Sequence, residues 1–146
     1  MNSTTGFVPG RDLAAALKCK KILVVDDEPT VVATVAAHLR KGGFPHVRQE
    51  TDSRLVIEAI REYEPDMVLL DIFMPHISGL DLLEQISATP NFDNVVVMMF
   101  SSAGAEEEDR SLELGAMGFL PKPIIAEELI RIISTTFRIT NRFGAR

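Results

Sequence analysis

Cysteine is almost absent from the sequence, because Cys19 is the single example among 146 residues. One thiol cannot form an internal disulfide, and Cys19 lies in none of the spacings that bind zinc. Long apolar runs are also missing: the longest, 95–100, falls well short of the ~20 residues that span a bilayer. The apolar run 13–17 is too short for the core of a signal peptide. These absences favour a cytoplasmic protein that makes no contact with a membrane.

Basic residues are outnumbered, with 15 Lys and Arg against 21 Asp and Glu, which gives a net charge of -6 and a pI near 5.0. The chain lacks the clusters of Lys and Arg with which proteins bind nucleic acid or anionic lipid. No glycine-rich phosphate-binding loop follows an apolar run, which argues against nucleotide hydrolysis. With 46% hydrophobic and 25% charged residues, the composition and length are typical of one folded domain. A cationic ligand or partner would complement its charge.

Five short runs predict strands, and five helical patterns alternate with them. Four of the runs are continuously apolar, which is typical of parallel strands covered on both faces, and one is polar enough for a sheet edge. The predicted strands are Lys21–Val25, His46–Glu50, Met67–Leu70, 95–100 and 118–120, and the predicted helices are 31–41, 53–63, Gly79–Ala88, 105–114 and 126–137. This alternation predicts an α/β fold with one doubly wound, five-stranded parallel sheet. The expected strand order is the flavodoxin-like 2-1-3-4-5.

Polar side chains follow four of the five predicted strands. Asp26 and Asp27 come directly after the first strand, and Asp71 comes directly after the third. Ser101 ends the fourth apolar run, and Lys122 lies just after the fifth. In a sheet of this kind, ligands bind beyond the carboxyl ends of the strands, at the point where the strand order reverses. We therefore expect the three carboxylates to converge there, with the hydroxyl and the ammonium nearby.

Three neighbouring carboxylates raise one another's pKa unless a cation neutralises them. A set of oxygen ligands favours a hard cation, and Mg²⁺ in particular, because it keeps waters that a phosphate oxygen can replace. Lys122 would then supply a positive charge to phosphate oxygens and Ser101 a hydroxyl donor, while Asp71 is a candidate nucleophile for a phosphoryl group. The pattern predicts magnesium-dependent phosphoryl chemistry at Asp71.

Plainer interpretations exist for the individual residues. An Asp-Asp pair after a strand is, on its own, more often a turn or a helix cap than a metal site, and the second acidic position is what favours the metal. Ser101 is as readily a cap for the following helix. The run Ser101-Ser102-Ala103 also leaves the position of the functional hydroxyl open by one residue, and Ser101 is preferred because it directly follows the apolar run.

Three segments carry motifs in order along the chain. They are Leu23-Val-Val-Asp-Asp-Glu-Pro29, then Val68-Leu-Leu-Asp-Ile-Phe-Met-Pro75 with Ser78-Gly-Leu80, and then Gly115-Ala-Met-Gly-Phe-Leu-Pro-Lys-Pro123. Together, from about residue 20 to residue 137, these motifs resemble the receiver domains of two-component response regulators, which are CheY-like proteins. The resemblance divides the chain into an N-terminal extension (1–19), a receiver domain (20–138) and a tail or linker stub (139–146).

The resemblance assigns roles around Asp71. It implies that a sensor histidine kinase or a phosphotransfer protein phosphorylates Asp71. Asp27 would bind Mg²⁺ directly, Asp26 through water or by orienting it, and Phe73 through its backbone carbonyl. Lys122 would bind the phosphoryl oxygens, and its bond to the following proline would be cis.

The resemblance also implies how a signal leaves the domain. Ser101 would swing toward the phosphoryl group, Phe119 would turn inward, and the surface of the fourth helix, fifth strand and fifth helix would change. That surface would contact an unidentified downstream protein, a lost output domain or a second copy of the chain. Phe73 and Ala103 are both apolar at positions that influence hydrolysis of the acyl phosphate in the family, so we expect slow self-dephosphorylation.

Two alternatives stay open. One is an enzyme, a Mg²⁺-dependent phosphatase with an aspartyl nucleophile, although such enzymes place Asp-x-Asp after the first strand and here Glu28 occupies the third place. The other concerns the last helix, whose apolar residues sweep roughly 180°, wider than packing on a sheet requires. The extra apolar edge is either an interface or a surface that the N-terminal extension covers.

Overall fold

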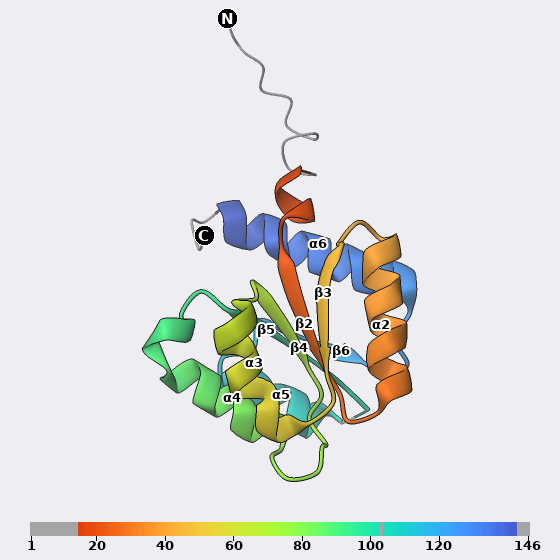
Figure 1. Ribbon diagram of the computed structural model, residues 1–146. Coiled ribbons are helices and arrows are strands. Elements are labelled where there is room, and N and C mark those ends of the chain that lie inside the picture. Colours follow the sequence, from red (N-terminus) through yellow and green to blue (C-terminus); the bar gives the residue numbers. More distant parts are fainter. Residues whose placement is uncertain (1–14, 103, 143–146) are drawn as a thin grey trace, which may run out of the picture.

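The structure, a computed structural model, describes residues 15–102 and 104–142 (Figure 1). Within them, five parallel strands form one sheet in the order β3-β2-β4-β5-β6. The strands are β2 (Lys21–Val25), β3 (His46–Glu50), β4 (Met67–Leu70), β5 (Val96–Ser101) and β6 (Gly118–Pro121). Counted along the chain this order is 2-1-3-4-5, which confirms the predicted topology.

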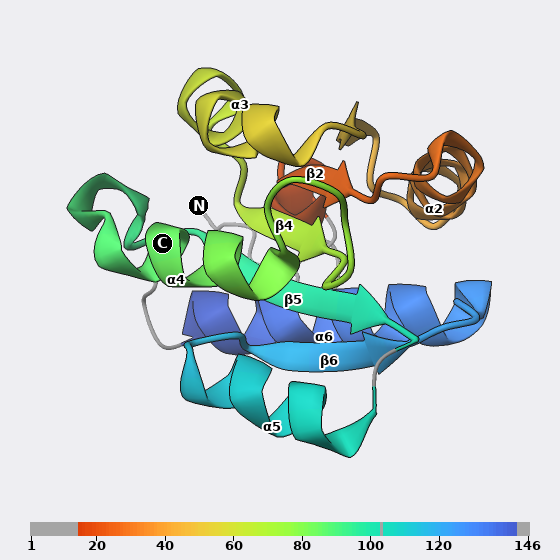
Figure 2. The same ribbon diagram turned by 90° about the horizontal axis from the view of Figure 1, so that it is seen from below.

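Helices cover both faces of the sheet (Figures 1 and 2). They are α2 (Pro29–Lys41), α3 (Val56–Tyr63), α4 (Gly79–Ala88), α5 (Ala105–Glu113) and α6 (Ala126–Arg142), with two 3₁₀ turns, η1 (Ser53–Leu55) and η2 (Pro90–Phe92). Helices α2 and α6 pack on one face, and α3, α4 and α5 pack on the other. Each helix returns the chain to the amino end of the sheet, so every strand points its carboxyl end the same way.

The two faces of the sheet build two hydrophobic clusters, because successive strand residues point to opposite sides. On β2, Ile22 and Val24 face the cluster of α2 and α6, whereas Leu23 and Val25 face the cluster of α3 and α4. All four side chains are fully buried. This double coverage explains why the strand reads as a continuous apolar run.

Several element ends differ from the prediction. The pattern 53–63 is divided into η1 and α3, because the Asp52 carboxylate accepts the backbone N–H of Arg54 and starts a separate 3₁₀ turn. Helix α2 begins two residues earlier than predicted, at Pro29, and β5 is shifted by one residue. Proline fits the first turn of a helix, because the amide hydrogen that it lacks has no partner there. Helix α6 runs to Arg142, past residue 138, where the sequence placed the end of the domain.

Residues before the sheet reach α6. Residues 15–18 are helical, and Leu17 joins the core cluster that contains Phe137. The Lys20 ammonium lies 5.6 Å from the centre of the Phe137 ring. The described residues just before the sheet therefore pack against part of α6, while Ile125 and Ile139 keep 59% and 48% of their surface exposed. None of the described helices is both long enough and apolar enough to cross a membrane.

Candidate functional site

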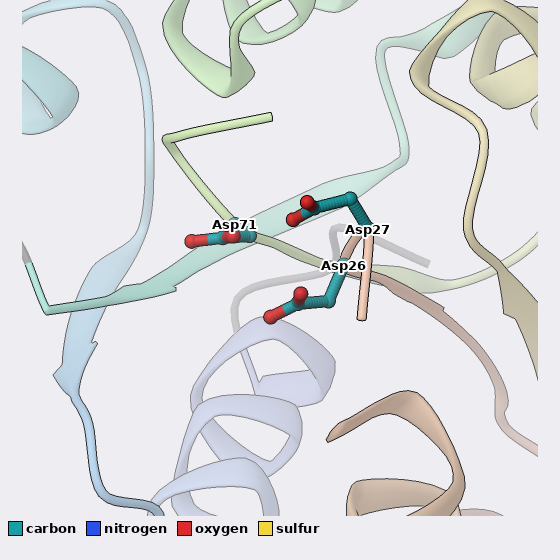
Figure 3. A group of neighbouring side chains, drawn as sticks. All are labelled: Asp26, Asp27 and Asp71. Carbon is teal, nitrogen blue, oxygen red and sulfur yellow. The ribbon is translucent and has the colours of Figure 1, made fainter. Parts of the chain in front are cut away.

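The carboxyl ends of β2 and β4 bring three aspartates to one point of the molecule. Asp26 and Asp27 follow β2, and Asp71 follows β4. The two strands are parallel neighbours with Val25 opposite Leu70, so the residues after them lie side by side. One carboxylate oxygen from each aspartate lies within 4.8 Å of the others, and Figure 3 shows the three side chains grouped beside one another.

Two of these acids are deeply buried, because Asp26 and Asp71 keep only 0% and 4% of their surface exposed. Asp27 is half-buried. Backbone donors hold both buried carboxylates: Asp26 Oδ1 accepts the N–H of Glu28 at 2.9 Å, and Asp71 Oδ1 accepts the N–H of Ile72 at 2.8 Å. Each buried group therefore has a fixed direction and still has oxygen lone pairs for other partners.

Lys122, directly after β6, places its ammonium against both buried acids. Its Nζ lies 2.6 Å from Asp26 Oδ2 and 3.6 Å from Asp71 Oδ2. Burial alone would lower the pKa of Lys122, but the hydrogen bond to Asp26 and the charge of Asp71 outweigh it, so the pKa is raised. The ammonium therefore stays charged at neutral pH. The Lys122–Pro123 peptide bond is cis, as the resemblance implies.

Ser101 is the last residue of β5 and is buried. Its side chain hydrogen-bonds Asp71. Ser102 instead is exposed and lines a groove beside α2. The following helix, α5, has its cap at Gly104, whose N–H donates to the Glu107 carboxylate at 3.1 Å. In the structure Ser101 therefore contacts the acidic cluster and does not cap α5.

The pKa of Asp71 is raised from 3.8 to about 6. Burial is the largest cause, and the negative charge of Asp26 adds to it. The opposing effects come from Lys122, from the hydrogen bond with Ser101 and from the N–H of Ile72. One ammonium is therefore not enough to offset the burial of two neighbouring carboxylates.

The ligand chemistry of the cluster suits a small hard cation. All three donors are carboxylates, and oxygen-only sets favour Mg²⁺, Ca²⁺ or Mn²⁺ over softer ions. Three carboxylates lie together beside one ammonium, so a cation would improve the charge balance of the cluster. Asp26, Asp27 and Asp71 therefore fit the predicted metal site.

A loop after β4 closes over Asp71. Its return is unusually tight: a Cβ added to Gly79 would lie 1.9 Å from the carbonyl oxygen of Asp71, so only glycine fits. The N–H of Gly79 donates to the carbonyl of Ile72 at 2.7 Å, which closes the base of the loop. Within the loop, the Phe73 side chain is 58% exposed.

Phe119, on β6, is half-buried against the cluster of α3, α4 and α5. Ala103 lies outside the described residues.

Sequence reasoning overlooked Ser53. In the structure Ser53 is buried, and its hydroxyl contacts the loop after Asp71, at Pro75 and Ile77. These partners are 22 and 24 residues away along the chain. No local pattern signals such a contact, because it depends on how the carboxyl ends of β3 and β4 are placed in the sheet.

The raised pKa of Asp71 predicts a measurable pH dependence of stability. The folded pKa of about 6 exceeds the ordinary 3.8, so between these values the folded state holds the proton more tightly than the unfolded state. Without Mg²⁺, the contribution of Asp71 to the free energy of unfolding therefore falls as the pH rises through this window. Asp71→Asn removes that effect and is expected to be roughly 3 kcal/mol more stable than wild type at pH 7.

Chemical denaturation of both proteins from about pH 3.5 to pH 7.5, in chelator, measures this difference across the whole window. The exposed Asp93 provides the control, because Asp93→Asn changes the same chemical group away from the cluster. A stability gap between wild type and Asp71→Asn that does not vary with pH would contradict the prediction.

Comparisons with known proteins agree with this geometry. The sequence of Escherichia coli (strain K12) phosphate regulon transcriptional regulatory protein PhoB is 32% identical over 120 residues, which covers 82% of this chain and 52% of PhoB. Among solved structures, the CheX–CheY–BeF3–Mg complex from Borrelia burgdorferi matches with a TM-score of 0.73 and 26% identity, over 81% of this chain and 89% of that chain. A CheY-like receiver domain protein from Methanospirillum hungatei JF-1 matches with a TM-score of 0.77 and 24% identity, over 86% and 98% of the two chains.

The chain spans between 23% and 60% of the length of the curated relatives that it matches. A family model described as the response regulator receiver domain matches residues 22–134. That range takes in the three aspartates and all five strands except Lys21, the first residue of β2. The chain belongs to the response regulator receiver domain family.

Proposed function

We propose that this chain accepts a phosphoryl group on Asp71 in a magnesium-dependent reaction and passes on the signal by a change of surface. The observation that carries the proposal is the convergence of Asp26, Asp27 and Asp71 at one edge of the sheet, with Lys122 against two of them. Three acids, an ammonium and the Ser101 hydroxyl suit the transfer of a highly charged group.

In the proposed reaction, an Asp71 carboxylate oxygen bonds to phosphorus while the bond from phosphorus to the donor's leaving atom breaks. For a phosphohistidine donor, the leaving atom is the imidazole nitrogen, which takes a proton as it departs. Lys122 is placed to bind the phosphoryl oxygens, because its Nζ already lies 3.6 Å from Asp71 Oδ2. The Ser101 hydroxyl, at the end of β5, offers a hydrogen-bond donor to the same phosphoryl oxygens.

Asp26, Asp27 and Asp71 would hold Mg²⁺, together with the backbone carbonyl of Phe73. When bound, the ion supplies positive charge to the acids and to the phosphoryl oxygens. A solved relative supports this assignment, since the Borrelia burgdorferi complex pairs CheY with BeF3 and Mg.

The proposed partners follow from the family. A sensor histidine kinase or a phosphotransfer protein would be the donor, in the cytoplasm. The receiver would span 20–138, between an extension (1–19) and a tail (139–146). Its output would be a separate protein or another domain, as the name of the relative PhoB, a transcriptional regulatory protein, suggests. Movement of Ser101 toward the phosphoryl group, followed by Phe119, would change the surface of α5, β6 and α6.

The competing enzyme function, a phosphatase with an aspartyl nucleophile, has less support. Such enzymes place Asp-x-Asp after the first strand, and here the third place holds the longer side chain of Glu28, which is exposed. The signalling function is therefore preferred, and the chain itself is not expected to turn over substrate.

The direct test is incubation with acetyl phosphate or phosphoramidate and Mg²⁺, followed by intact-protein mass spectrometry. We expect one alkali-labile phosphoryl group, because acyl phosphates hydrolyse in alkali. Asp71→Asn should carry none, and chelation should prevent the modification of wild type. Asp81→Asn is the matched control, since Asp81 lies on α4 away from the cluster. A phosphoryl group that Asp71→Asn still acquires would refute the assignment of Asp71 as the phosphoacceptor. Steady turnover of a small phosphoester by wild type would favour the phosphatase.

Self-dephosphorylation is expected to be slow. Phe73, two residues after Asp71, presents an apolar and largely exposed side chain that cannot orient an attacking water. Phe73→Asn supplies an amide that can, so its acyl phosphate should decay several times faster than that of wild type. The decay is measured by mass spectrometry after the donor is removed. Equal decay in both proteins would count against this role for Phe73.

Self-association is proposed through the face of α5, β6 and α6. Leu112, Met117 and Ile125 are 45%, 52% and 59% exposed there. Sedimentation velocity with BeF3 and Mg²⁺ should show a dimer that Met117→Asp abolishes and that Leu55→Asp retains, because Leu55 is equally exposed (51%) but lies on η1. A wild-type protein that stays monomeric at all concentrations, with and without BeF3, rules out this association.

A further inference from the structure

The loop that follows Asp71 contains a strained turn. His76 has a φ of 74°, in the left-handed region that residues other than glycine seldom adopt. The N–H of Ile77 donates to the carbonyl of Pro75 at 2.9 Å, across His76. A three-residue turn with this hydrogen bond and a positive φ is a γ-turn of the rare, strained kind. Such a turn persists only where surrounding contacts hold it.

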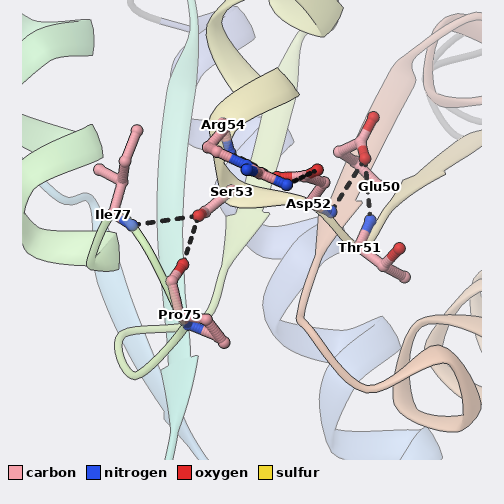
Figure 4. Close-up of polar contacts among 7 residues, drawn as sticks. All are labelled: Glu50, Thr51, Asp52, Ser53, Arg54, Pro75 and Ile77. Carbon is pink, nitrogen blue, oxygen red and sulfur yellow. Dashed lines mark hydrogen bonds and ion pairs between the residues drawn. The ribbon is translucent and has the colours of Figure 1, made fainter.

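The Ser53 side chain forms hydrogen bonds with both ends of this turn (Figure 4). Its hydroxyl donates to the carbonyl of Pro75 at 2.6 Å and accepts the N–H of Ile77 at 3.2 Å. Ser53 is 3% exposed, so water competes little for either bond. One hydroxyl thus uses its donor and an acceptor lone pair on the two peptide groups that define the turn.

The position of Ser53 is itself fixed by neighbouring residues (Figure 4). The Glu50 carboxylate accepts the backbone N–H groups of Thr51 and Asp52 at 3.1 and 3.0 Å. The Asp52 carboxylate in turn accepts the Arg54 backbone N–H at 2.9 Å and two bonds from its guanidinium, both at 3.0 Å. These contacts order the segment between β3 and α3, and Ser53 projects from it toward the neighbouring loop.

The loop that Ser53 holds, between Asp71 and Gly79, lies next to the proposed metal site. Phe73, whose carbonyl is the proposed fourth protein ligand, lies between Asp71 and the turn. Gly79 closes the loop at its base through its bond to Ile72, and Ser53 holds the far end. Asp27, Ser53 and Pro75 line the same cleft. Movement of the turn would therefore change where the Phe73 carbonyl points relative to Asp27 and Asp71.

We propose that Ser53 is a positioning residue that holds the strained turn at His76 and so presets the loop for Mg²⁺ binding. This inference rests on the proposed function, because it assigns to Ser53 a role in the affinity of the metal site. In this proposal Ser53 contacts neither the metal nor the phosphoryl group. Loss of its hydroxyl should weaken Mg²⁺ binding and leave the chemistry at Asp71 intact once Mg²⁺ is saturating.

The test measures Mg²⁺ binding to the full unphosphorylated chain by isothermal titration calorimetry at fixed pH. Ser53→Ala is expected to weaken binding about tenfold, within the range seen when a residue that supports a metal ligand is lost. Ser111→Ala is the matched control: its hydroxyl is equally buried and donates to Glu107 within α5 at 2.8 Å, away from the loop. Thermal unfolding of each variant checks that it is folded.

A second measurement separates positioning from a general loss of structure. The rate of phosphorylation by phosphoramidate is followed against Mg²⁺ concentration. For Ser53→Ala the half-saturating Mg²⁺ concentration should rise by the same factor as the dissociation constant, while the plateau rate equals that of wild type. A lower plateau with unchanged half-saturation would overturn the positioning role.

The strain itself is tested by the double variant Ser53→Ala/His76→Gly. Glycine adopts a φ of 74° without steric cost, so the turn no longer depends on the hydroxyl. Its Mg²⁺ affinity should recover toward wild type, and an affinity as low as that of Ser53→Ala alone refutes the link to His76. Wild-type binding that Ser53→Ala leaves unchanged refutes the inference only, whereas a wild type that binds no Mg²⁺ refutes the proposed metal site and the inference with it.

Discussion

Two buried carboxylates that share one ammonium constrain the rest of this structure. Asp26 and Asp71 are almost completely buried, and Lys122 lies 2.6 and 3.6 Å from them. Buried charges are costly unless they are paired and hydrogen-bonded, and here the pairing is incomplete. Burial, with the negative charge of Asp26 adding to it, raises the pKa of Asp71 to about 6. Such a site costs folding free energy by itself, and a bound cation would offset part of that cost.

The topology of the sheet makes that arrangement possible, and most of it could be predicted from the sequence. The apolar runs of β2 and β4 identify strands that are covered on both faces, and each run ends at an aspartate. A parallel sheet places those ends at one edge, so the proximity of Asp26 and Asp71 follows once the two strands are neighbours. The polar character of His46–Glu50 likewise fits its place as an edge strand.

Other features could not be predicted, because they depend on contacts between distant segments. The sequence favoured Ser101 over Ser102 without excluding Ser102, and their surroundings appear only in the structure: Ser101 is buried at Asp71, and Ser102 is exposed. The continuation of α6 past residue 138 is another such feature, and its Phe137 lies in a core cluster to which Leu17 contributes from before the sheet. The hydrogen bonds of Ser53 to Pro75 and Ile77 form because two loops that are distant in the sequence lie close together in space.

The two sides of the acidic site are held by different means, and this difference would matter for the proposed binding of magnesium. Asp26 and Asp71 emerge from paired strands, where the sheet hydrogen bonds fix the backbone. The loop after Asp71 has no such ladder, and of the contacts described here it depends on the bond of Gly79 at its base and on Ser53 at its far end. Mg²⁺ requires nearly octahedral geometry at short distances, so charge alone does not make a good site. The strands therefore supply the negative charge. The placement of the proposed ligands around Mg²⁺ would depend on the loop after Asp71, which is less firmly held.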